Sequence, residues 1–209
     1  MGAHAHRGRG CRRAGPTHQP AARGAAPPHR SARVTPPQAP LKLVVAGPVG
    51  AGKTTFVQTL SETPVIATEA EASEDIGKRH TTVAFDFGTL TLDGQAVHLY
   101  GTPGQERFNF MWEVLCEGAL GLVLLVAGDR PQDFAHARNI LEFITSRVAV
   151  PFLIGVTRQD QPRVWTPGDV ALYFDLPAPH VTGLNATEPG DARRVLIRLL
   201  ELTLHPQSS

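Results

Sequence analysis

Short apolar runs alternate with longer amphipathic stretches along the chain from Leu41 onward. A short run rich in aliphatic and β-branched residues, bounded by turn residues, is typical of a buried strand, whereas apolar residues spaced three or four apart are typical of a helix. Strands that alternate with helices in this way predict a doubly wound α/β sheet. The predicted strands are Leu41–Ala46, Thr82–Thr91, Ala96–Tyr100, Gly121–Ala127, Pro151–Val156 and His180–Gly183.

The connections between these runs predict which strands are antiparallel. Asp93-Gly94 is a tight-turn signal, so the strands on either side of it are expected to form an antiparallel hairpin. The other strands are joined by helices, which begin at Lys53, span about Pro131–Arg147, begin after a capping Thr166 and span about Asp191–Leu204. The stretch from Thr63 to His80 matches neither pattern and is expected to be a loop. The sequence therefore predicts a six-stranded, mostly parallel sheet with one antiparallel hairpin strand and helices on both faces.

The charge of the chain is divided unevenly. The 209 residues have a formal net charge of +1, but residues 1–40 carry seven arginines and no acidic residue, which leaves a net charge of −6 on the remainder. Residues 1–40 are poor in large apolar side chains and are expected to be a disordered basic tail. Scattered arginines without neighbouring aromatic residues are weak evidence of nucleic-acid binding, so no specific nucleic acid is expected as a partner. Residues 41–204 are predicted to form one globular domain, followed by a short tail at 205–209.

Cysteine content and hydropathy bear on the cellular compartment. The two cysteines, Cys11 and Cys116, form no metal-binding quartet, and this suits a reducing compartment. No secretory segment follows Met1, and the longest apolar run, Ala119–Ala127, is about half of a membrane span. A cytoplasmic protein without a transmembrane segment is therefore expected, with attachment to a membrane through a partner left open.

A phosphate-binding motif lies between the first predicted strand and the first predicted helix. The segment Gly47-Pro-Val-Gly-Ala-Gly-Lys53-Thr54 matches G-x-x-x-x-G-K-[ST] at every fixed position. Glycines allow the backbone N–H groups to curl around a phosphate, the helix N-terminus adds partial positive charge, and Lys53 adds a full charge. The Thr54 hydroxyl is expected to bind Mg²⁺, and a glycine-rich turn without a ligand is the alternative. The residues predicted to hold the phosphates are Gly47, Gly50, Ala51, Gly52, Lys53, Thr54 and Thr55.

Two further segments resemble the switch regions of Ras-superfamily small GTPases. The segment Gly101-Thr-Pro-Gly-Gln105-Glu-Arg-Phe108 follows a predicted strand and resembles the switch II pattern D-x-x-G-Q-E-R-F, and Thr82-Val-Ala-Phe-Asp86-Phe-Gly88 looks like switch I. The resemblance implies a P-loop NTPase G domain in which Thr82 binds Mg²⁺, the Gly104 backbone binds the γ-phosphate, and Gln105 orients the attacking water. Thr81 in place of Thr82, and an ordinary loop role for Gln105, stay open as alternatives.

One position departs from the family pattern. The acidic residue with which switch II begins in small GTPases, and which holds Mg²⁺ through water, is Gly101 here. The departure implies weaker magnesium binding, compensation by another acid such as Asp86, or slow hydrolysis. A comparable loss occurs in bacterial small GTPases similar to the gliding-polarity switch protein, and the stretch Phe108-Asn-Phe110-Met-Trp112 resembles the conservon GTPases of actinomycetes. This resemblance covers about residues 41–204.

The predicted base-binding loop follows the strand that ends at Val156. The segment Thr157-Arg158-Gln159-Asp160 resembles the [NT]-K-x-D motif with which GTPases recognise guanine, and the carboxylate of Asp160 is in register. Arg158 replaces the lysine whose stem stacks on the base, and its flat guanidinium can also stack. Ala186, in Asn185-Ala186-Thr187, falls where the family presents a backbone N–H to the guanine oxygen. A turn residue without a ligand is the alternative for Asp160.

These features together favour a GTP-binding molecular switch that hydrolyses GTP to GDP slowly, with Mg²⁺ as a cofactor. The alternatives are a nucleotide-binding module with negligible turnover, an ATP-binding P-loop protein and, disfavoured by the lack of an arginine-rich lid segment, a P-loop kinase. The resemblance implies a regulatory partner protein, such as a roadblock-type regulator or a histidine kinase system. Arg79 is a candidate catalytic residue that would stabilise charge on the γ-phosphate, with a solvated loop cation as the alternative.

Overall fold

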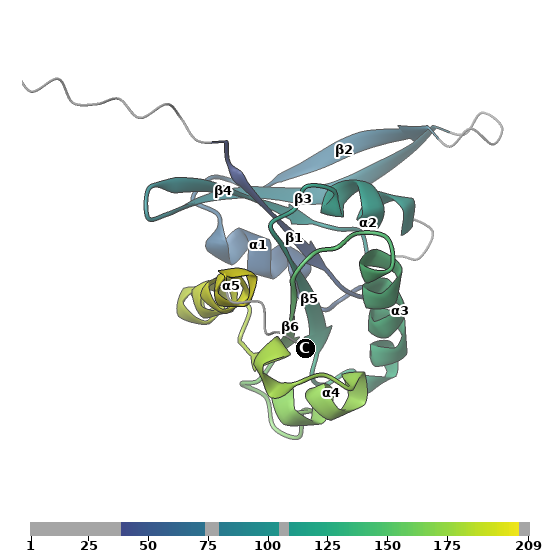
Figure 1. The fold of residues 1–209 in the computed structure, drawn as a ribbon, viewed down its shortest axis with the longest axis vertical. Helices are drawn as coiled ribbons and strands as arrows, with labels where there is room; N and C mark the ends of the chain where they lie inside the picture. The colour runs from purple at the N-terminus through teal and green to yellow at the C-terminus, as the bar shows by residue number, and fades with distance from the viewer. Residues whose placement is uncertain (1–38, 74–79, 105–108, 205–209) are drawn as a thin grey trace, which may run out of the picture. The chain divides into compact units, whose positions relative to one another are not determined.

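The computed structural model describes residues 39–73, 80–104 and 109–204 (Figure 1). The predicted basic tail, the candidate catalytic residues Arg79 and Gln105, and the short tail at 205–209 lie outside the described residues. Nothing in the described part therefore tests these predictions.

The described residues form a seven-stranded sheet with the order β2-β3-β4-β1-β5-β6-β7. β1 pairs in parallel with β4 and β5, and the parallel pairing continues from β5 to β6 and from β6 to β7. β3 is antiparallel to both of its neighbours, β2 and β4. The bounds are β1 Leu41–Ala46, β2 Ile66–Ser73, β3 His80–Leu92, β4 Gln95–Gly101, β5 Gly121–Ala127, β6 Phe152–Thr157 and β7 Val181–Gly183.

All six predicted strands and the predicted hairpin are present, and the structure adds β2. The expectation of a loop between Thr63 and His80 was wrong over residues 66–73, which form this strand. The segment IATEAEAS is rich in Ala and Glu, which are poor strand formers, so its propensity is weak. β2 forms because it pairs along its full length with β3 at the edge of the sheet, and a long-range pairing of this kind leaves no local signal.

The helices connect these strands as the sequence predicts, with one addition. They are α1 Lys53–Leu60, α2 Asn109–Cys116, α3 Phe134–Thr145, α4 Pro167–Phe174 and α5 Pro189–Leu204. The predicted helix at 131–147 is a 3₁₀ turn at Pro131–Asp133 followed by α3, and α2 is the helix that was not predicted. Among the described residues, no helix combines the length and the apolar character needed to cross a membrane.

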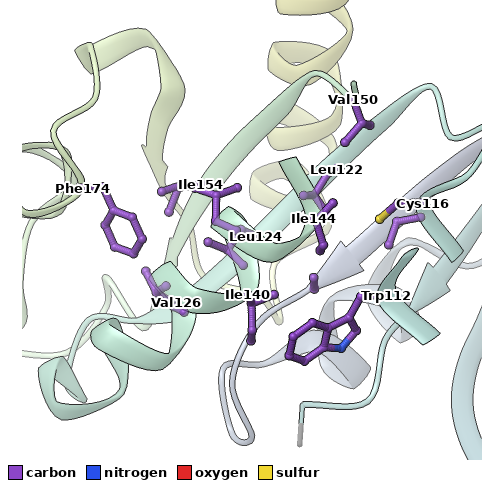
Figure 2. Close-up of a cluster of buried hydrophobic side chains, with 14 of the residues drawn as sticks. Trp112, Cys116, Leu122, Leu124, Val126, Ile140, Ile144, Val150, Ile154 and Phe174 are labelled. Carbon is purple, nitrogen blue, oxygen red and sulfur yellow. The ribbon is translucent and has the colours of Figure 1, made fainter. Parts of the chain in front are cut away.

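Apolar side chains fill both faces of the sheet. Every residue of β5 is buried, and successive side chains along it point to opposite faces. Leu122, Leu124 and Val126 pack with side chains of α2, α3 and α4, including the Trp112, Ile140 and Phe174 drawn in Figure 2. Val123 and Leu125 pack on the other face with side chains of α1 and α5, the two helices that lie side by side in Figure 1.

This topology decides where a binding site can form. β1, β4, β5, β6 and β7 are parallel, so their carboxyl ends meet at one edge of the sheet. The segments that follow β1, β4, β6 and β7 contain the predicted phosphate loop, the start of the predicted switch II and the two predicted base loops. Ligands of open α/β sheets bind at this edge.

Candidate functional site

The phosphate-binding loop is the turn between β1 and α1, and two of its glycines are required by its geometry. Gly47 has φ 141°, and a Cβ atom at this position would lie 2.2 Å from the carbonyl oxygen of Leu125. Gly52 has φ 95° in the left-handed region and forms the N-cap of α1. Side chains are strained in this backbone conformation, so glycine allows the chain to turn and enter the helix. The unpaired N–H groups at the start of α1 then face the site.

Lys53 is the first residue of α1, and its ammonium group is held inside the loop. Its Nζ donates hydrogen bonds of 2.8 Å to the carbonyl oxygens of Gly47 and Pro48, and the residue is only 9% exposed. Burial lowers the pKa of Lys53 from 10.5 to about 8, and the nearby Asp86 carboxylate opposes this shift. The group is therefore protonated at neutral pH and placed where phosphate oxygens would replace backbone carbonyls.

The next residue, Thr54, contacts a carboxylate from a different part of the sheet. Its hydroxyl donates a 2.6 Å hydrogen bond to Oδ2 of Asp86, which lies on β3. Asp86 is paired in register with Gly101 on β4, the position where small GTPases carry the switch II acid. A Cβ atom at Gly101 would lie 3.1 Å from Cβ of Asp86 and 3.3 Å from its Oδ2. The Asp86 carboxylate therefore lies beside the position from which the expected carboxylate is missing.

The donor atoms at this point suit a hard cation. Among the described residues, no group of three or more His, Cys, Asp or Glu side chains is arranged as a metal site. Mg²⁺ is usually held by one or two protein oxygens together with nucleotide phosphates and water, so a closed protein cage is not required. The hydroxyl of Thr54 and the carboxylate of Asp86 are oxygen donors beside the phosphate loop. The residues present therefore fit Mg²⁺ bound together with a nucleotide.

Thr157 and Arg158, at the end of β6, fix the phosphate loop to the base loop. The buried hydroxyl of Thr157 lies 3.1 Å from the carbonyl oxygen of Ala51 and 3.2 Å from that of Val126. Arg158 donates a 3.0 Å hydrogen bond to the carbonyl oxygen of Gly50 and forms an ion pair with Asp129. These contacts engage the guanidinium of Arg158. The part of Arg158 that would stack on the base is therefore its aliphatic stem and not the guanidinium predicted from the sequence.

One pocket joins the phosphate loop to both predicted base loops. Its volume is about 490 Å³, within the range of ligand pockets. Most of the predicted binding residues line it, whereas Gly47, Ala51 and Gly104 do not. The predicted residues in its wall are Gly50, Gly52, Lys53, Thr54, Thr55, Thr157, Arg158, Asp160 and Ala186, joined by Gln161, Asn185 and Thr187.

The three additional residues in the wall, Gln161, Asn185 and Thr187, were not predicted as binding residues. Asn185 and Thr187 flank Ala186, and Asn185 Oδ1 accepts hydrogen bonds from the backbone N–H and the hydroxyl of Thr187. The backbone N–H of Asn185 donates to Asp191 at the start of α5. These bonds shape the loop around Ala186. Gln161 follows Asp160 directly, and nothing in its local sequence identifies it.

The predicted γ-phosphate residue Gly104 lies against the phosphate loop. A Cβ atom on Gly104 would lie 2.7 Å from the backbone nitrogen of Val49 and 2.8 Å from Nζ of Lys53. Its carbonyl oxygen is 3.1 Å from Nε2 of His136 on α3, and the indole N–H of Trp112 on α2 donates to the carbonyl of Pro103 at 3.0 Å. Two helices thus position the first residues of the predicted switch II.

Thr82, the predicted second metal ligand, lies within a strand and not in a loop. It lies within β3, where it pairs with Glu71 of β2, and Thr81 pairs with Ala72 in the same ladder. The side chains of both threonines lie outside the described part of the structure. The structure therefore leaves the choice between Thr81 and Thr82 open.

Comparisons with known proteins agree with this architecture. The solved structure of the Arl6 BBS3 small GTPase from Trypanosoma brucei, with the bound nucleotide analogue GppNp, superimposes with a TM-score of 0.63. The match covers 81% of the present chain and 100% of the Trypanosoma brucei chain, and the two sequences are 15% identical. At this identity the likeness shows the fold alone. The described residues therefore have the fold of a small GTPase.

Similarity at the level of sequence extends to several relatives, among them the following two, and to one family. An uncharacterised protein of Methanocaldococcus jannaschii is 32% identical over 126 residues, which are 57% of this chain and 71% of the relative. ADP-ribosylation factor-like protein 8d of Arabidopsis thaliana is 29% identical over 117 residues, which are 54% of this chain and 61% of the plant protein. The family described as "Conserved hypothetical ATP binding protein" matches residues 64–187, a stretch that begins after the phosphate loop and includes both base loops. Because this match extends over more than half of the chain, the protein belongs to that family.

Proposed function

We propose that this protein is a GTP-binding molecular switch that hydrolyses GTP slowly and signals to a partner protein through its switch segments. The observation that carries the proposal is the continuous pocket that joins the phosphate loop around Lys53 to the loops that contain Asp160 and Ala186. The phosphate and base loops come from parallel strands of one sheet edge, as a nucleotide would require. The small-GTPase fold and the plant ADP-ribosylation factor-like relative support the same function.

The phosphate loop supplies most of the binding chemistry. Lys53 would exchange its bonds to the carbonyls of Gly47 and Pro48 for bonds to phosphate oxygens, which are charge-assisted and stronger. Bound Mg²⁺ would neutralise charge on the phosphates. The hydroxyl of Thr54 is placed to be one of its ligands, with Thr82 as the proposed second. The N–H of Gly104 is proposed to report the presence of the γ-phosphate.

Guanine rather than adenine is the proposed base. Asp160 lines the pocket and is exposed to it, so its carboxylate can accept hydrogen bonds from the ring N–H and the exocyclic amine of guanine. Adenine presents an acceptor at the first of these positions. The name of the family favours ATP as a second candidate nucleotide. GTP and ATP differ only in the base, so recognition of the base decides between these two candidates.

The change Asp160→Asn tests the base assignment. The amide places an N–H group against the donors of guanine and leaves buried groups unpaired, at about 1–3 kcal/mol for each. We expect the preference to shift from GTP toward XTP, whose base carries an acceptor in place of the exocyclic amine. Competition against a fluorescent guanine nucleotide measures this shift. The matched control is Asp175→Asn at the C-terminus of α4, a position with a left-handed backbone that Asn tolerates. An unchanged preference for GTP in Asp160→Asn would contradict the role of Asp160.

Gln105 and Arg79 are the proposed catalytic residues, with Gln105 orienting the attacking water and Arg79 stabilising charge on the γ-phosphate. Single-turnover hydrolysis of GTP by the wild type and by Gln105→Ala and Arg79→Ala tests both roles. We expect each change to slow hydrolysis at least about tenfold, or about 1.4 kcal/mol of barrier, while GTP affinity changes little. Lys78→Ala is the control for Arg79, because it removes a positive charge from the neighbouring residue.

Gly101 motivates a second candidate, a nucleotide-binding module with negligible turnover. A glycine offers no carboxylate for Mg²⁺, and weak cation binding would slow phosphoryl transfer. The same single-turnover experiment separates the two functions. GTP that remains intact on the wild-type protein would support the binding module, whereas hydrolysis that depends on Gln105 supports the switch.

The partner and the cellular location remain part of the proposal. A switch acts by offering different surfaces to a partner in its two nucleotide states. The resemblance to conservon-type and gliding-polarity-type GTPases makes a roadblock-type regulator or a histidine kinase system the proposed partner. A cytoplasmic location is proposed with it. Co-purification of tagged protein loaded with GDP or with a non-hydrolysable GTP analogue tests whether a partner distinguishes the two states.

A further inference from the structure

We propose that Asp86, on β3, is the positioning carboxylate for the divalent cation, in place of the switch II acid that this chain lacks. In the expected arrangement that acid would stand at residue 101, the last residue of β4. Here residue 101 is glycine, and its register partner on the neighbouring antiparallel strand is Asp86. The carboxylate would thus reach the same part of the site from the adjacent strand. This inference rests on the proposed function.

The space around Gly101 supports the inference that a carboxylate at residue 86 replaces one at residue 101. A Cβ atom at residue 101 would lie 3.1 Å from Cβ of Asp86, which is tighter than ordinary contact. The same Cβ atom would lie 3.5 Å from Cγ2 of Val57 on α1. Side chains at both positions would therefore compete for one space. The glycine at 101 allows the Asp86 carboxylate to lie against β4, beside the start of α1.

The hydrogen bond to Thr54 gives the carboxylate its direction. Thr54 donates its proton to Oδ2 of Asp86 at 2.6 Å, so the remaining lone pairs of the hydroxyl oxygen are free to bind a cation. A carboxylate that accepts a hydrogen bond from a metal ligand orients that ligand and increases its basicity. Within the described part of the chain, Thr54 is the hydrogen-bond donor to Asp86. A carboxylate has several lone pairs, and those of Asp86 would accept hydrogen bonds from water bound to the cation.

The charge of Asp86 also acts on the phosphate loop. Burial lowers the pKa of Lys53 and the Asp86 carboxylate raises it, so the two groups interact electrostatically. The same negative charge would attract a divalent cation bound beside it. A purely structural role would require the hydrogen bond to Thr54 but not the negative charge. The amide variant Asp86→Asn separates these roles, because it keeps a hydrogen-bond acceptor and removes the charge.

The test measures cation affinity rather than hydrolysis. Full-length protein is loaded with fluorescent GDP, and Mn²⁺ binding is followed by electron paramagnetic resonance while nucleotide release is timed with Mg²⁺ and with excess chelator. For Asp86→Asn we expect cation affinity to fall at least about tenfold, as is typical when a residue that hydrogen-bonds to a metal ligand is replaced. Release with Mg²⁺ should be faster than for wild type, and release in chelator should be the same. The matched control Asp93→Asn, an exposed acid in the β3–β4 turn, should behave as wild type in both measurements.

An exchange variant provides the second arm. Asp86→Gly combined with Gly101→Asp moves the carboxylate from β3 to β4, and we expect it to recover most of the affinity lost in Asp86→Gly alone. Melting temperatures show whether each variant is folded. The assignment of Asp86 would be overturned if a folded Asp86→Asn protein bound Mn²⁺ with unchanged affinity. It would also be overturned if the rate of nucleotide release from the wild type were the same with and without Mg²⁺. Failure of the wild type to bind any nucleotide would instead contradict the proposed function.

Discussion

The ammonium group of Lys53 is buried beside two backbone carbonyls instead of lying in solvent. Its pKa of about 8 still leaves it charged at neutral pH, so the folded protein holds a positive charge ready for a phosphate. Hydrogen bonds to the carbonyl oxygens of Gly47 and Pro48 stabilise the charged ammonium group without a ligand. The side chain is thus prepared for binding and also supports the loop that forms the site.

Replacing Lys53 with alanine should remove most of the nucleotide affinity. Loss of charge-assisted bonds to phosphate is expected to weaken binding by about 3 kcal/mol or more, which is over 100-fold. Titration with a fluorescent guanine nucleotide measures the loss. Lys42→Ala is the matched control, because it removes a lysine of β1 that bonds to the carbonyl oxygen of Glu117. Equal affinities for Lys53→Ala and wild type would show that the phosphates lie elsewhere.

Cys116 offers a test of burial that does not depend on any ligand. Its side chain is fully buried at the end of α2, and burial raises the pKa of the thiol from 9.0 to about 12. Between these values the unfolded chain loses the thiol proton and the folded chain keeps it, so the free energy of unfolding decreases as the pH rises. The expected slope from Cys116 is about 1.4 kcal/mol for each pH unit between about 9 and 12, with none below pH 9.

Urea unfolding at several pH values measures this slope. The fall in stability above pH 9 should be steeper in wild type than in Cys116→Ala, and Cys11→Ala should follow the wild type. Parallel pH curves for wild type and Cys116→Ala would contradict the burial of the thiol.

Single residues of the site differed in how far the sequence could predict them. Lys53, Thr157 and Asp160 lie in contiguous motifs, where spacing alone predicts their places at or just beyond the end of a strand or at the start of a helix. The structure brings all three to one pocket. From the sequence, Asp86 was named only as one example of an acid that compensates for Gly101. Its contact with Thr54 depends on the register between β3 and β4, which local sequence does not encode.

Among the helices, α4 has the most clearly defined start. The hydroxyl of Thr166 accepts a bond from the backbone N–H of Asp169, and the carboxylate of Asp169 accepts one from the backbone N–H of Thr166. The Thr166 hydroxyl also donates a 2.7 Å hydrogen bond to Oδ2 of Asp169, and this bond, together with the one from the backbone N–H, lowers the pKa of the Asp169 carboxyl. The sequence predicted Thr166 as the cap of this helix, and the structure confirms it and adds the reciprocal bond to the Asp169 carboxylate.

Removing the cap should affect stability without affecting binding. The change Thr166→Ala is expected to reduce the free energy of unfolding by about 1 kcal/mol, while Thr166→Ser should retain nearly all of it. Urea unfolding measures the difference, and nucleotide titration should give the same affinity for all three proteins. A Thr166→Ala protein as stable as wild type would mean that the cap contributes nothing to the fold.

Helix α2 and strand β2 were the elements that sequence patterns failed to predict. In α2 the segment NFMWEVLC is apolar at most positions, so no amphipathic period distinguishes a helix from a strand. Its place is fixed by tertiary packing, because Trp112 and Cys116 are buried against the sheet (Figure 2). β2 depends on β3 in the same way. Both elements are defined by distant partners, whereas β1 and α1 are defined by their own sequence.

For the molecule as a whole, the order of motifs along the chain predicted more than any single motif. A phosphate loop, a switch II-like segment and a base loop, each following a predicted strand, implied that these strands share one sheet edge. The parallel pairing from β4 through β1, β5 and β6 to β7 confirms this arrangement. The identity of the base is the remaining point on which the proposed switch and the ATP-binding alternative differ.

The most direct measurement is the competition of unlabelled GTP and ATP against fluorescent GDP on the full-length wild-type protein in the presence of Mg²⁺. We expect GTP to displace the probe at a concentration at least about tenfold lower than ATP, because adenine would set an acceptor against the carboxylate of Asp160. Displacement by ATP at an equal or lower concentration would contradict the assignment of this protein as a guanine-nucleotide switch.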